Sequence, residues 1–185
     1  TGDIDGDGLK EVVAVTDKSM VYVLANDGAL NWQYEKEGES LNLLVNDLYG
    51  DNRAEIYVGG INYDALLSDG ETPVITARFP GVSILATFAA DIDGDGQREI
   101  LFGSDNGVEY IFKKEKTSFR RGHIVLDLPT TDVWAGDIDG DGQPEIVPSP
   151  AGGHVVYVFK ANGQPLWQKA LDQEVSLVQG GDVDG

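Results

Sequence analysis

The feature that most constrains the fold is an acidic run that recurs along the chain at nearly constant spacing. The runs DIDGDGLKE (3–11), DIDGDGQRE (91–99) and DIDGDGQPE (137–145) are nearly identical, and DLYGDNRAE (47–55) is a degenerate copy. A fifth run begins as DVDG at 182–185. The runs start about 45 residues apart, and a fixed period of this length is typical of a repeat architecture.

A second motif repeats in the same register. VYVLANDGALNWQYE begins at Val21 and VYVFKANGQPLWQKA at Val156, so Trp32 and Trp167 hold equivalent positions. Alternating apolar residues around Asp-Gly or Asn-Gly turns predict β-hairpins, and we find no helical spacing supported by caps. The expected strands are Glu11–Thr16, Glu55–Gly60, Glu99–Ser104, Glu145–Pro148, Met20–Ala25, Val108–Lys113, Val155–Lys160, Ala29–Tyr34, Pro165–Ala170, Leu41–Val45, Ile84–Ala89, Asp132–Ala135 and Val175–Gln179.

Four strands per unit of about 45 residues predict an all-β chain built from β-propeller blades. Residues 1–185 are then one propeller segment, with repeats that start near 3, 47, 91 and 137 and a fifth loop begun at 182. A blade cannot bury both of its faces alone, so neighbouring blades must stack. We expect Trp32 and Trp167 to pack between blades.

The two ends leave three arrangements open. Val175–Gln179 is expected to be a first strand with no blade after it, and Glu11–Thr16 a second strand with no first strand before it. These segments could pair within one chain as a four-bladed ring, pair between two chains, or belong to a longer propeller. The cut loop at 182–185 and the missing initiator Met favour the third arrangement, a larger ring.

Composition excludes several function classes. A formal charge of −19 at pH 7 argues against a nucleic-acid partner, because phosphate binding needs an excess of Lys and Arg. The chain has no cysteine and two histidines, His123 and His154, so zinc and copper lack a ligand set. No apolar run is long enough to span a bilayer, so we expect no membrane insertion of this segment.

The acidic runs predict cation sites. Acids at positions 1, 3 and 5 converge when the chain curls, glycine at position 6 permits the turn, and position 7 offers a carbonyl. An EF-hand needs glutamate at position 12 between helices, whereas here the last acid is at position 9 between strands. This irregular oxygen cage favours Ca²⁺ over Mg²⁺. The predicted ligands are Asp3, Asp5, Asp7, Leu9, Glu11, Asp91, Asp93, Asp95, Gln97, Glu99, Asp137, Asp139, Asp141, Gln143 and Glu145.

Two of the runs are incomplete. In the second run, Tyr49 replaces the acid at position 3 and Asn52 replaces the glycine at position 6, although asparagine still adopts a left-handed turn. The last run stops after position 4. We expect weak calcium binding or none at the residues of these runs, Asp47, Asp51, Glu55, Asp182 and Asp184.

The D-x-D-x-D-G-x-x-E loop, followed by strands such as EIV and VYVF, resembles the FG-GAP/VCBS repeat. That calcium-binding β-propeller family includes the propeller of integrin α subunits and many microbial surface proteins. The DG-x-L-x-W hairpin resembles blades of quinoprotein-like propellers. The resemblance implies a propeller stabilised by Ca²⁺, each loop lying between the innermost and second strands of a blade, and an extracellular or cell-surface location. It implies no particular ligand, because fold does not fix function.

Two function classes follow from the resemblance. The first is a secreted or cell-surface binding, adhesion or scaffold module for protein or carbohydrate, with further blades of the same or a second chain as other partners. The second is the propeller part of a calcium-dependent polysaccharide lyase, because rhamnogalacturonan lyases look similar in these loops. A lyase needs a general base, and the only histidines that could serve as one are His154 and His123, which lie in no recognised catalytic motif. The sequence therefore favours a non-catalytic role. The basic stretch KKEKTSFRR (113–121) offers a surface for an acidic partner or glycan.

Overall fold

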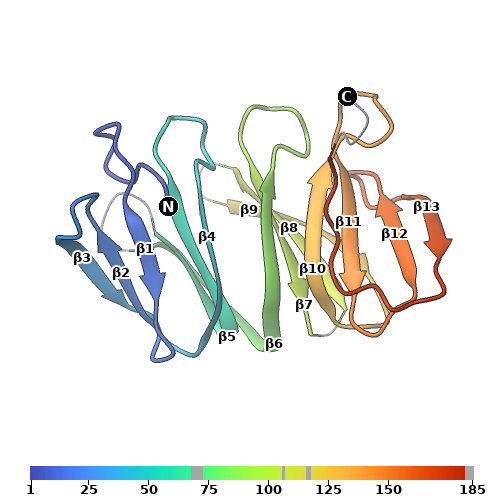
Figure 1. Cartoon of the computed structure of the whole chain (residues 1–185), viewed down its shortest axis with the longest axis horizontal. Helices are drawn as coiled ribbons and strands as arrows, with labels where there is room; N and C mark the ends of the chain where they lie inside the picture. Colours follow the sequence, from blue (N-terminus) through green and yellow to red (C-terminus); the bar gives the residue numbers. More distant parts are fainter. Residues whose placement is uncertain (68–72, 106, 116–117, 182–185) are drawn as a thin grey trace. The chain divides into compact units, whose positions relative to one another are not determined.

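The computed structural model describes residues 1–67, 73–105, 107–115 and 118–181 (Figure 1). Those residues form β-strands and no helix, so the all-β prediction is confirmed, and none of them forms a helix able to cross a membrane. The strands are β1 (Val12–Val15), β2 (Met20–Leu24), β3 (Leu30–Glu35), β4 (Ser40–Asn46), β5 (Glu55–Leu67), β6 (Pro73–Ala90), β7 (Glu99–Ser104), β8 (Val108–Glu115), β9 (Ser118–Val125), β10 (Thr130–Gly136), β11 (Glu145–Pro150), β12 (Val155–Phe159) and β13 (Pro165–Ala170).

The chain divides into two compact units, Thr1–Ile84 and Leu85–Gly185, with the boundary inside β6. The strands form three sheets, in the orders β1-β2-β3, β4-β5-β6-β7-β8-β9 and β10-β11-β12-β13. In the first unit, β5 pairs with β4 through its first half and with β6 through its second half. No strand pairing among the described residues closes the sheets into a ring. The propeller prediction is therefore supported only as far as antiparallel, blade-like sheets.

Tight turns in the first and last sheets follow from their Asp-Gly and Asn-Gly sequences. Between β2 and β3, Gly28 has φ +88°, and Ala29 N–H donates to the Asp27 carboxylate at 2.9 Å. Between β12 and β13, Gly163 has φ +82°, and the Asn162 amide oxygen accepts the equivalent bond at 2.9 Å. A left-handed glycine and a side-chain acceptor close both turns, as the sequence predicts.

The core of the first unit lies where the β1–β3 sheet meets β5. Val21 and Val23 of β2 are fully buried, and so are Ile56 and Val58 of β5. These four residues belong to one apolar cluster, and Trp32 of β3 packs against it. The prediction that Trp32 packs between neighbouring blade-like sheets is confirmed.

The core of the second unit follows the same plan. Ile92 and Leu101, from the third loop and β7, cluster with Val133 and Ile146 of β10 and β11. Trp167 of β13 differs from its counterpart in the first unit, because 43% of it is exposed. The prediction that Trp167 packs between blades is wrong for the described residues, which contain no sheet over this side chain.

Some strands differ in length from the predictions. β7 and β13 have the predicted bounds, whereas β5 and β6 extend beyond the predicted Glu55–Gly60 and Ile84–Ala89. Asn62 with φ +62° and Gly81 with φ +76° face each other at a register shift, and Gly81 N–H donates to the Asn62 side-chain oxygen at 2.6 Å. This bulge lets both strands continue beyond their predicted bounds.

The predicted strand Val175–Gln179 is wrong, because the segment forms no ladder. Val175 N–H donates to the Gly153 carbonyl at 2.8 Å, and Val178 N–H donates to the Asp132 carboxylate at 3.0 Å. In other repeats the strand before a loop pairs with the strand after it, as β4 pairs with β5. The described residues contain no strand after this segment, so it lies along the last sheet unpaired. Among the described strands β1 pairs with β2 alone, so the pairing expected for a four-bladed ring is not formed.

Candidate metal centre

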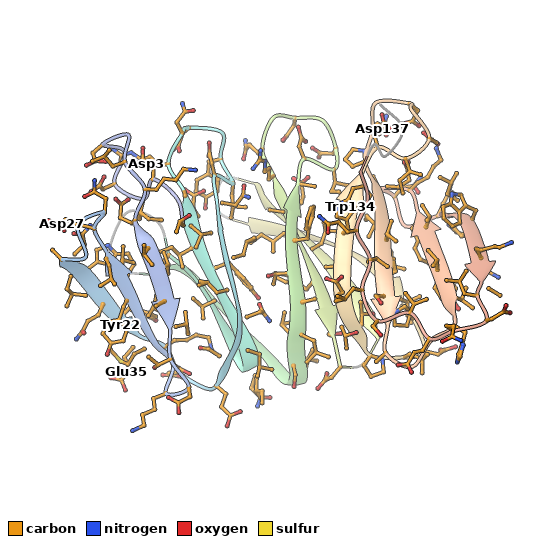
Figure 2. All side chains as sticks on the ribbon, viewed as in Figure 1. Asp3, Tyr22, Asp27, Glu35, Trp134 and Asp137 are labelled. Atoms are coloured by element: carbon orange, nitrogen blue, oxygen red, sulfur yellow. The ribbon has the colours of Figure 1, made fainter. Side chains whose placement is uncertain are left out.

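Each acidic run forms a loop at the start of a repeat. The second, third and fourth loops connect β4 to β5, β6 to β7 and β10 to β11, and the first loop leads into β1. Figure 2 labels Asp3 and Asp137, which open the first and the fourth loop. Loop positions are numbered 1 to 9 from the first aspartate, and the loops are 3–11, 47–55, 91–99 and 137–145.

All four loops share two left-handed residues. Position 4 has φ between +72° and +82° in Gly6, Gly50, Gly94 and Gly140, and position 6 has φ between +68° and +87° in Gly8, Asn52, Gly96 and Gly142. The expected left-handed conformation of Asn52 is confirmed. The sequence analysis did not predict a left-handed residue at position 4. The glycine that stands there in all four runs was the available signal.

The aspartate at position 1 holds the turn together. In the first loop, Gly6 N–H donates to Asp3 Oδ1 at 2.7 Å and Gly8 N–H donates to Asp3 Oδ2 at 2.9 Å. The same two bonds recur at 2.7 Å and at 2.9–3.0 Å in the other three loops. This carboxylate therefore orders the loop backbone whatever else the loop binds.

The glutamate at position 9 is buried in every loop, with at most 3% exposed. Its Oε2 accepts the N–H of position 2, an interaction we name the glutamate clamp, at 2.7 Å (Glu11–Ile4), 2.9 Å (Glu55–Leu48), 2.9 Å (Glu99–Ile92) and 3.0 Å (Glu145–Ile138). A buried carboxylate without such a partner would be strongly destabilising. Sequence reasoning assigned this residue to a metal alone. The persistence of Glu55 in the degenerate run was the signal for a second role.

Three loops gather carboxylate oxygens within reach of one ion. In each group, oxygens of positions 1, 3 and 9 lie within 4.8 Å of one another: Asp3, Asp5 and Glu11; Asp91, Asp93 and Glu99; Asp137, Asp139 and Glu145. Two oxygens bound to the same Ca²⁺ lie no more than about 5 Å apart, because each is about 2.3–2.6 Å from the ion. These all-oxygen donor sets fit calcium. The predicted ligands at position 5, Asp7, Asp95 and Asp141, lie outside the groups.

The second loop forms no such group among the described residues. Its position 3 is Tyr49, whereas Asp47 keeps its bonds to the turn and Glu55 keeps its clamp. The loop therefore has the shape of the others without the third carboxylate. Asp182 and Asp184 of the fifth run lie outside the described residues.

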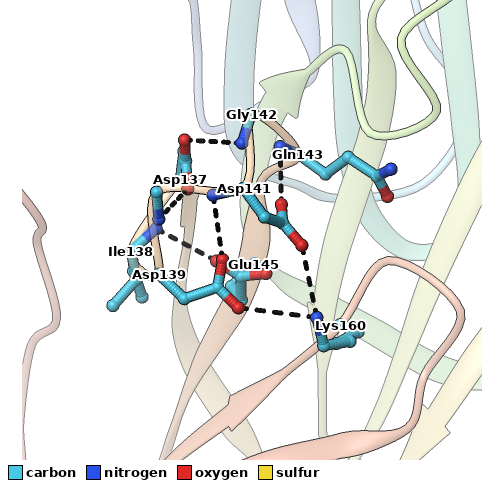
Figure 3. Close-up of polar contacts among 9 residues, drawn as sticks. Asp137, Ile138, Asp139, Asp141, Gly142, Gln143, Glu145 and Lys160 are labelled. Carbon is cyan, nitrogen blue, oxygen red and sulfur yellow. Dashed lines mark hydrogen bonds and ion pairs between the residues drawn. The ribbon is translucent and has the colours of Figure 1, made fainter.

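In the fourth loop an ammonium group already lies between two acids (Figure 3). Lys160 Nζ is 3.4 Å from Asp139 Oδ2 and 3.3 Å from Asp141 Oδ2. The side-chain hydrogen bond to Asp141 raises the pKa of Lys160, and the backbone hydrogen bond from Gln143, more than the lysine, lowers the pKa of Asp141. The equivalent residue of the first repeat is Ala25, so the first loop has no such tethered cation at this position.

The structure adds no contact that supports His154 or His123 as a catalytic base. His154 is exposed in the connection between β11 and β12, where its backbone carbonyl accepts the Leu171 N–H at 2.7 Å. The side chain of His123 and those of the basic stretch 113–121 lie outside the described part of the structure.

A family model described as "FG-GAP-like repeat" matches residues 91–147, which include the third and fourth loops. The match supports an FG-GAP-type repeat for this part of the chain. A search of curated proteins found no match.

Three solved structures are similar in fold. The biofilm matrix protein Bap1 of V. cholerae has a TM-score of 0.69 at 22% identity, over 91% of this chain and 27% of that one. BBS1N in complex with ARL6DN has a TM-score of 0.72 at 11% identity, over 92% and 55%. A protein of unknown function from Bacteroides caccae has a TM-score of 0.59 at 14% identity, over 93% and 61%. The chain thus spans between about a quarter and three fifths of these structures.

Proposed function

We propose that the chain is a calcium-stabilised segment of an extracellular or cell-surface propeller that acts as a binding, adhesion or scaffold module. One observation carries the proposal: the same three carboxylates converge in three loops that share one backbone conformation. The FG-GAP-like match over 91–147 and the likeness to a biofilm matrix protein favour a surface setting.

Positions 1, 3 and 9 would hold Ca²⁺ in the first, third and fourth loops, with the acid of position 5 and the carbonyl of position 7 (Leu9, Gln97, Gln143) completing the set. The ion would offset the repulsion among carboxylates that stand close together. It binds the folded loop and not the unfolded chain, so binding stabilises the fold. Extracellular calcium is concentrated enough to fill sites with Kd of about 10⁻⁴–10⁻³ M.

The proposed ligand of such a module is a protein or a carbohydrate. Further blades of the same kind are its other proposed partners. The basic stretch 113–121 is the proposed contact for an acidic group, because it is the strongest cationic run in a chain of net charge −19. The proposed role is non-catalytic. Incubation with pectic and other acidic polysaccharides should release no unsaturated product. Release of such a product by the wild-type chain, and its loss in His154→Ala, would overturn this part of the proposal.

Calorimetric titration of the metal-free chain with Ca²⁺ tests the metal proposal, and about three sites are expected. Asp5→Asn, Asp93→Asn and Asp139→Asn should each remove or weaken one site, because each replaces a position-3 carboxylate with a neutral side chain of the same shape. Tyr49→Phe, at position 3 of the second loop, is the matched control and should leave all three. No heat of binding, or equal binding after all three substitutions, would refute the proposal.

A further inference from the structure

A pocket lies between the connection from β9 to β10 and the outer strands of the last sheet. Its volume is about 360 Å³, within the range of sites that hold a small ligand or a single long side chain. The residues that line it belong to the third and fourth repeats, and all of them lie in the second unit. The pocket therefore lies within one compact unit, away from the three carboxylate groups.

The connection that forms one wall of the pocket is apolar where its counterpart in the first repeat is charged. By repeat register, VLDL at 125–128 corresponds to EKEG at 35–38. Val125 is 65% exposed and Leu128 is 42% exposed, and Asp127 is exposed between them. Apolar side chains gathered at one pocket, unlike single scattered ones, are typical of a binding site.

Hydrogen bonds hold this wall in place at both ends. Leu126 N–H donates to the Gly107 carbonyl at 2.7 Å, and Ala151 N–H donates to the Pro129 carbonyl at 2.7 Å. Gly107 has φ +73°, and a methyl group added there would collide with the Leu126 carbonyl, so glycine lets the connection lie this close. The wall is formed without a ligand, and a ligand would lose little affinity in ordering it.

Two aromatic residues of β12 form the floor. The rings of Tyr157 and Phe159 lie on the same face of the strand, with centroids 6.2 Å apart and planes inclined by 18°. Phe159 is buried in the core cluster of the second unit, and Tyr157 is half-buried and packs against that cluster. The core thus fixes Tyr157 in position, and its exposed part offers aromatic surface to the pocket.

The charge of the pocket favours a cation. Asp127 carries the one formal charge among the described residues that line the pocket. An anion would be repelled by this carboxylate and by the net charge of −19. A neutral ligand would gain little from it, whereas a cation is attracted by both a carboxylate and the face of an aromatic ring.

We propose that this pocket binds an arginine side chain of a protein partner. The aliphatic stem packs against Val125 and Leu128, because long basic side chains bury their stems on apolar surface. The planar guanidinium stacks on Tyr157 and pairs with Asp127, which suits arginine better than lysine. This inference rests on the proposed role as a binding module and names one partner chemistry for it. The contact is separate from 113–121, the proposed site for an acidic group.

An NMR titration tests the proposal with the peptide acetyl-Gly-Arg-Gly-amide, at about 0.15 M salt and saturating Ca²⁺. The peptide should shift the amide signals of 125–128 and of β12. The same peptide with citrulline, the neutral isostere of arginine, should bind about tenfold more weakly, because it loses the ion pair and most of the cation–π attraction. The ratio of the two affinities should be the same in chelator, so the result does not depend on calcium binding by the loops.

Two substitutions locate the site. Asp127→Asn should weaken binding of the arginine peptide about three- to fivefold, and Tyr157→Leu about two- to fivefold. Asp172→Asn is the matched control, because Asp172 is exposed and holds the equivalent position in the last repeat. It should bind the peptide like wild type. If Tyr157→Leu lowers the melting midpoint, Leu128→Ser repeats the test on the exposed wall, with a similar loss expected.

Equal binding of the arginine and citrulline peptides, or no shift at 125–128, would overturn the proposal. Equal loss of affinity in Asp127→Asn and Asp172→Asn would overturn it too, because the peptide would then follow the overall charge. Tighter binding of free L-arginine than of the peptide would assign the pocket to the amino acid, and tighter binding of glucose would assign it to a carbohydrate. Either result would reject a protein partner at this pocket.

Discussion

The second and third loops have the same backbone and different acids. Both have left-handed residues at positions 4 and 6, and both carry a glutamate clamp of 2.9 Å. They differ at position 3, where Asp93 belongs to a carboxylate group and Tyr49 does not. The comparison separates two properties that the sequence motif merges: all the loops share one set of internal hydrogen bonds and one shape, and the carboxylate at position 3 completes the group of three acids that could hold a cation.

Removing calcium should have the largest effect, because it acts on three loops and spares the second. Each site filled at 100 times its Kd contributes about 2.7 kcal/mol of stability, and three such sites should raise the melting midpoint by about 15 °C or more. Circular dichroism melts with Ca²⁺ and with a chelator measure the change, and Mg²⁺ at equal concentration is the control. Identical melting curves would mean that the loops are solvated turns.

Loss of the clamp should have the next largest effect and should distinguish the two loops. Glu55→Ala leaves the Leu48 N–H without its acceptor and should cost about 1–3 kcal/mol, equally with and without calcium. Glu99→Ala should cost a similar amount in chelator and more in calcium, because it also removes a ligand. Urea unfolding in both conditions measures this, with the exposed Glu35→Ala as control. A calcium-dependent cost for Glu55→Ala would contradict the comparison.

Restoring the missing acid should convert the second loop into a cation site. Tyr49→Asp combined with Asn52→Gly recreates the pattern of the third loop on a backbone that already has the required turn. Titration should then show about four sites in place of about three. Tyr49→Ser, which removes the ring without adding a carboxylate, should leave the number unchanged. If the double variant gains no site, position 3 is not the deciding residue.

Removing or adding a lysine beside a loop should have the smallest effect, a change in Ca²⁺ affinity at that loop alone. Lys160→Met should tighten Ca²⁺ binding at the fourth loop about three- to tenfold, because the ammonium no longer competes for Asp139 and Asp141. Ala25→Lys should weaken binding at the first loop by a similar factor. Both effects should shrink at high salt, which screens exposed charges. Calorimetry on the two variants and wild type measures the change, and equal affinities in all three would exclude competition by Lys160.

Features that depend on short stretches of sequence were predictable. Loop positions and most strand bounds follow from local signals, because glycine turns and alternating apolar residues act within a few residues. The convergence of Asp91, Asp93 and Glu99 could be anticipated for the same reason, as all three lie within one nine-residue loop.

Features that depend on neighbouring strands were not predictable. Lys160 reaches Asp139 because β12 is adjacent to β11, a contact across 21 residues of sequence. The bulge of Asn62 and Gly81 spans two strands, and it lets β5 and β6 continue past the predicted bounds Glu55–Gly60 and Ile84–Ala89. The tail 175–179 has the composition of a strand but lacks a described partner, and composition alone does not reveal the partner.

The paired turns of the first and last sheets bear on how this protein would age chemically. An asparagine followed by glycine, as in Asn162-Gly163, is a site of spontaneous deamidation, which converts the amide into an acid. The first sheet already carries that acid in Asp27-Gly28, with the same 2.9 Å bond to the turn backbone. Deamidation to aspartate at Asn162 would therefore add one negative charge while leaving the hairpin closed, so an old preparation can change its isoelectric point without losing its fold.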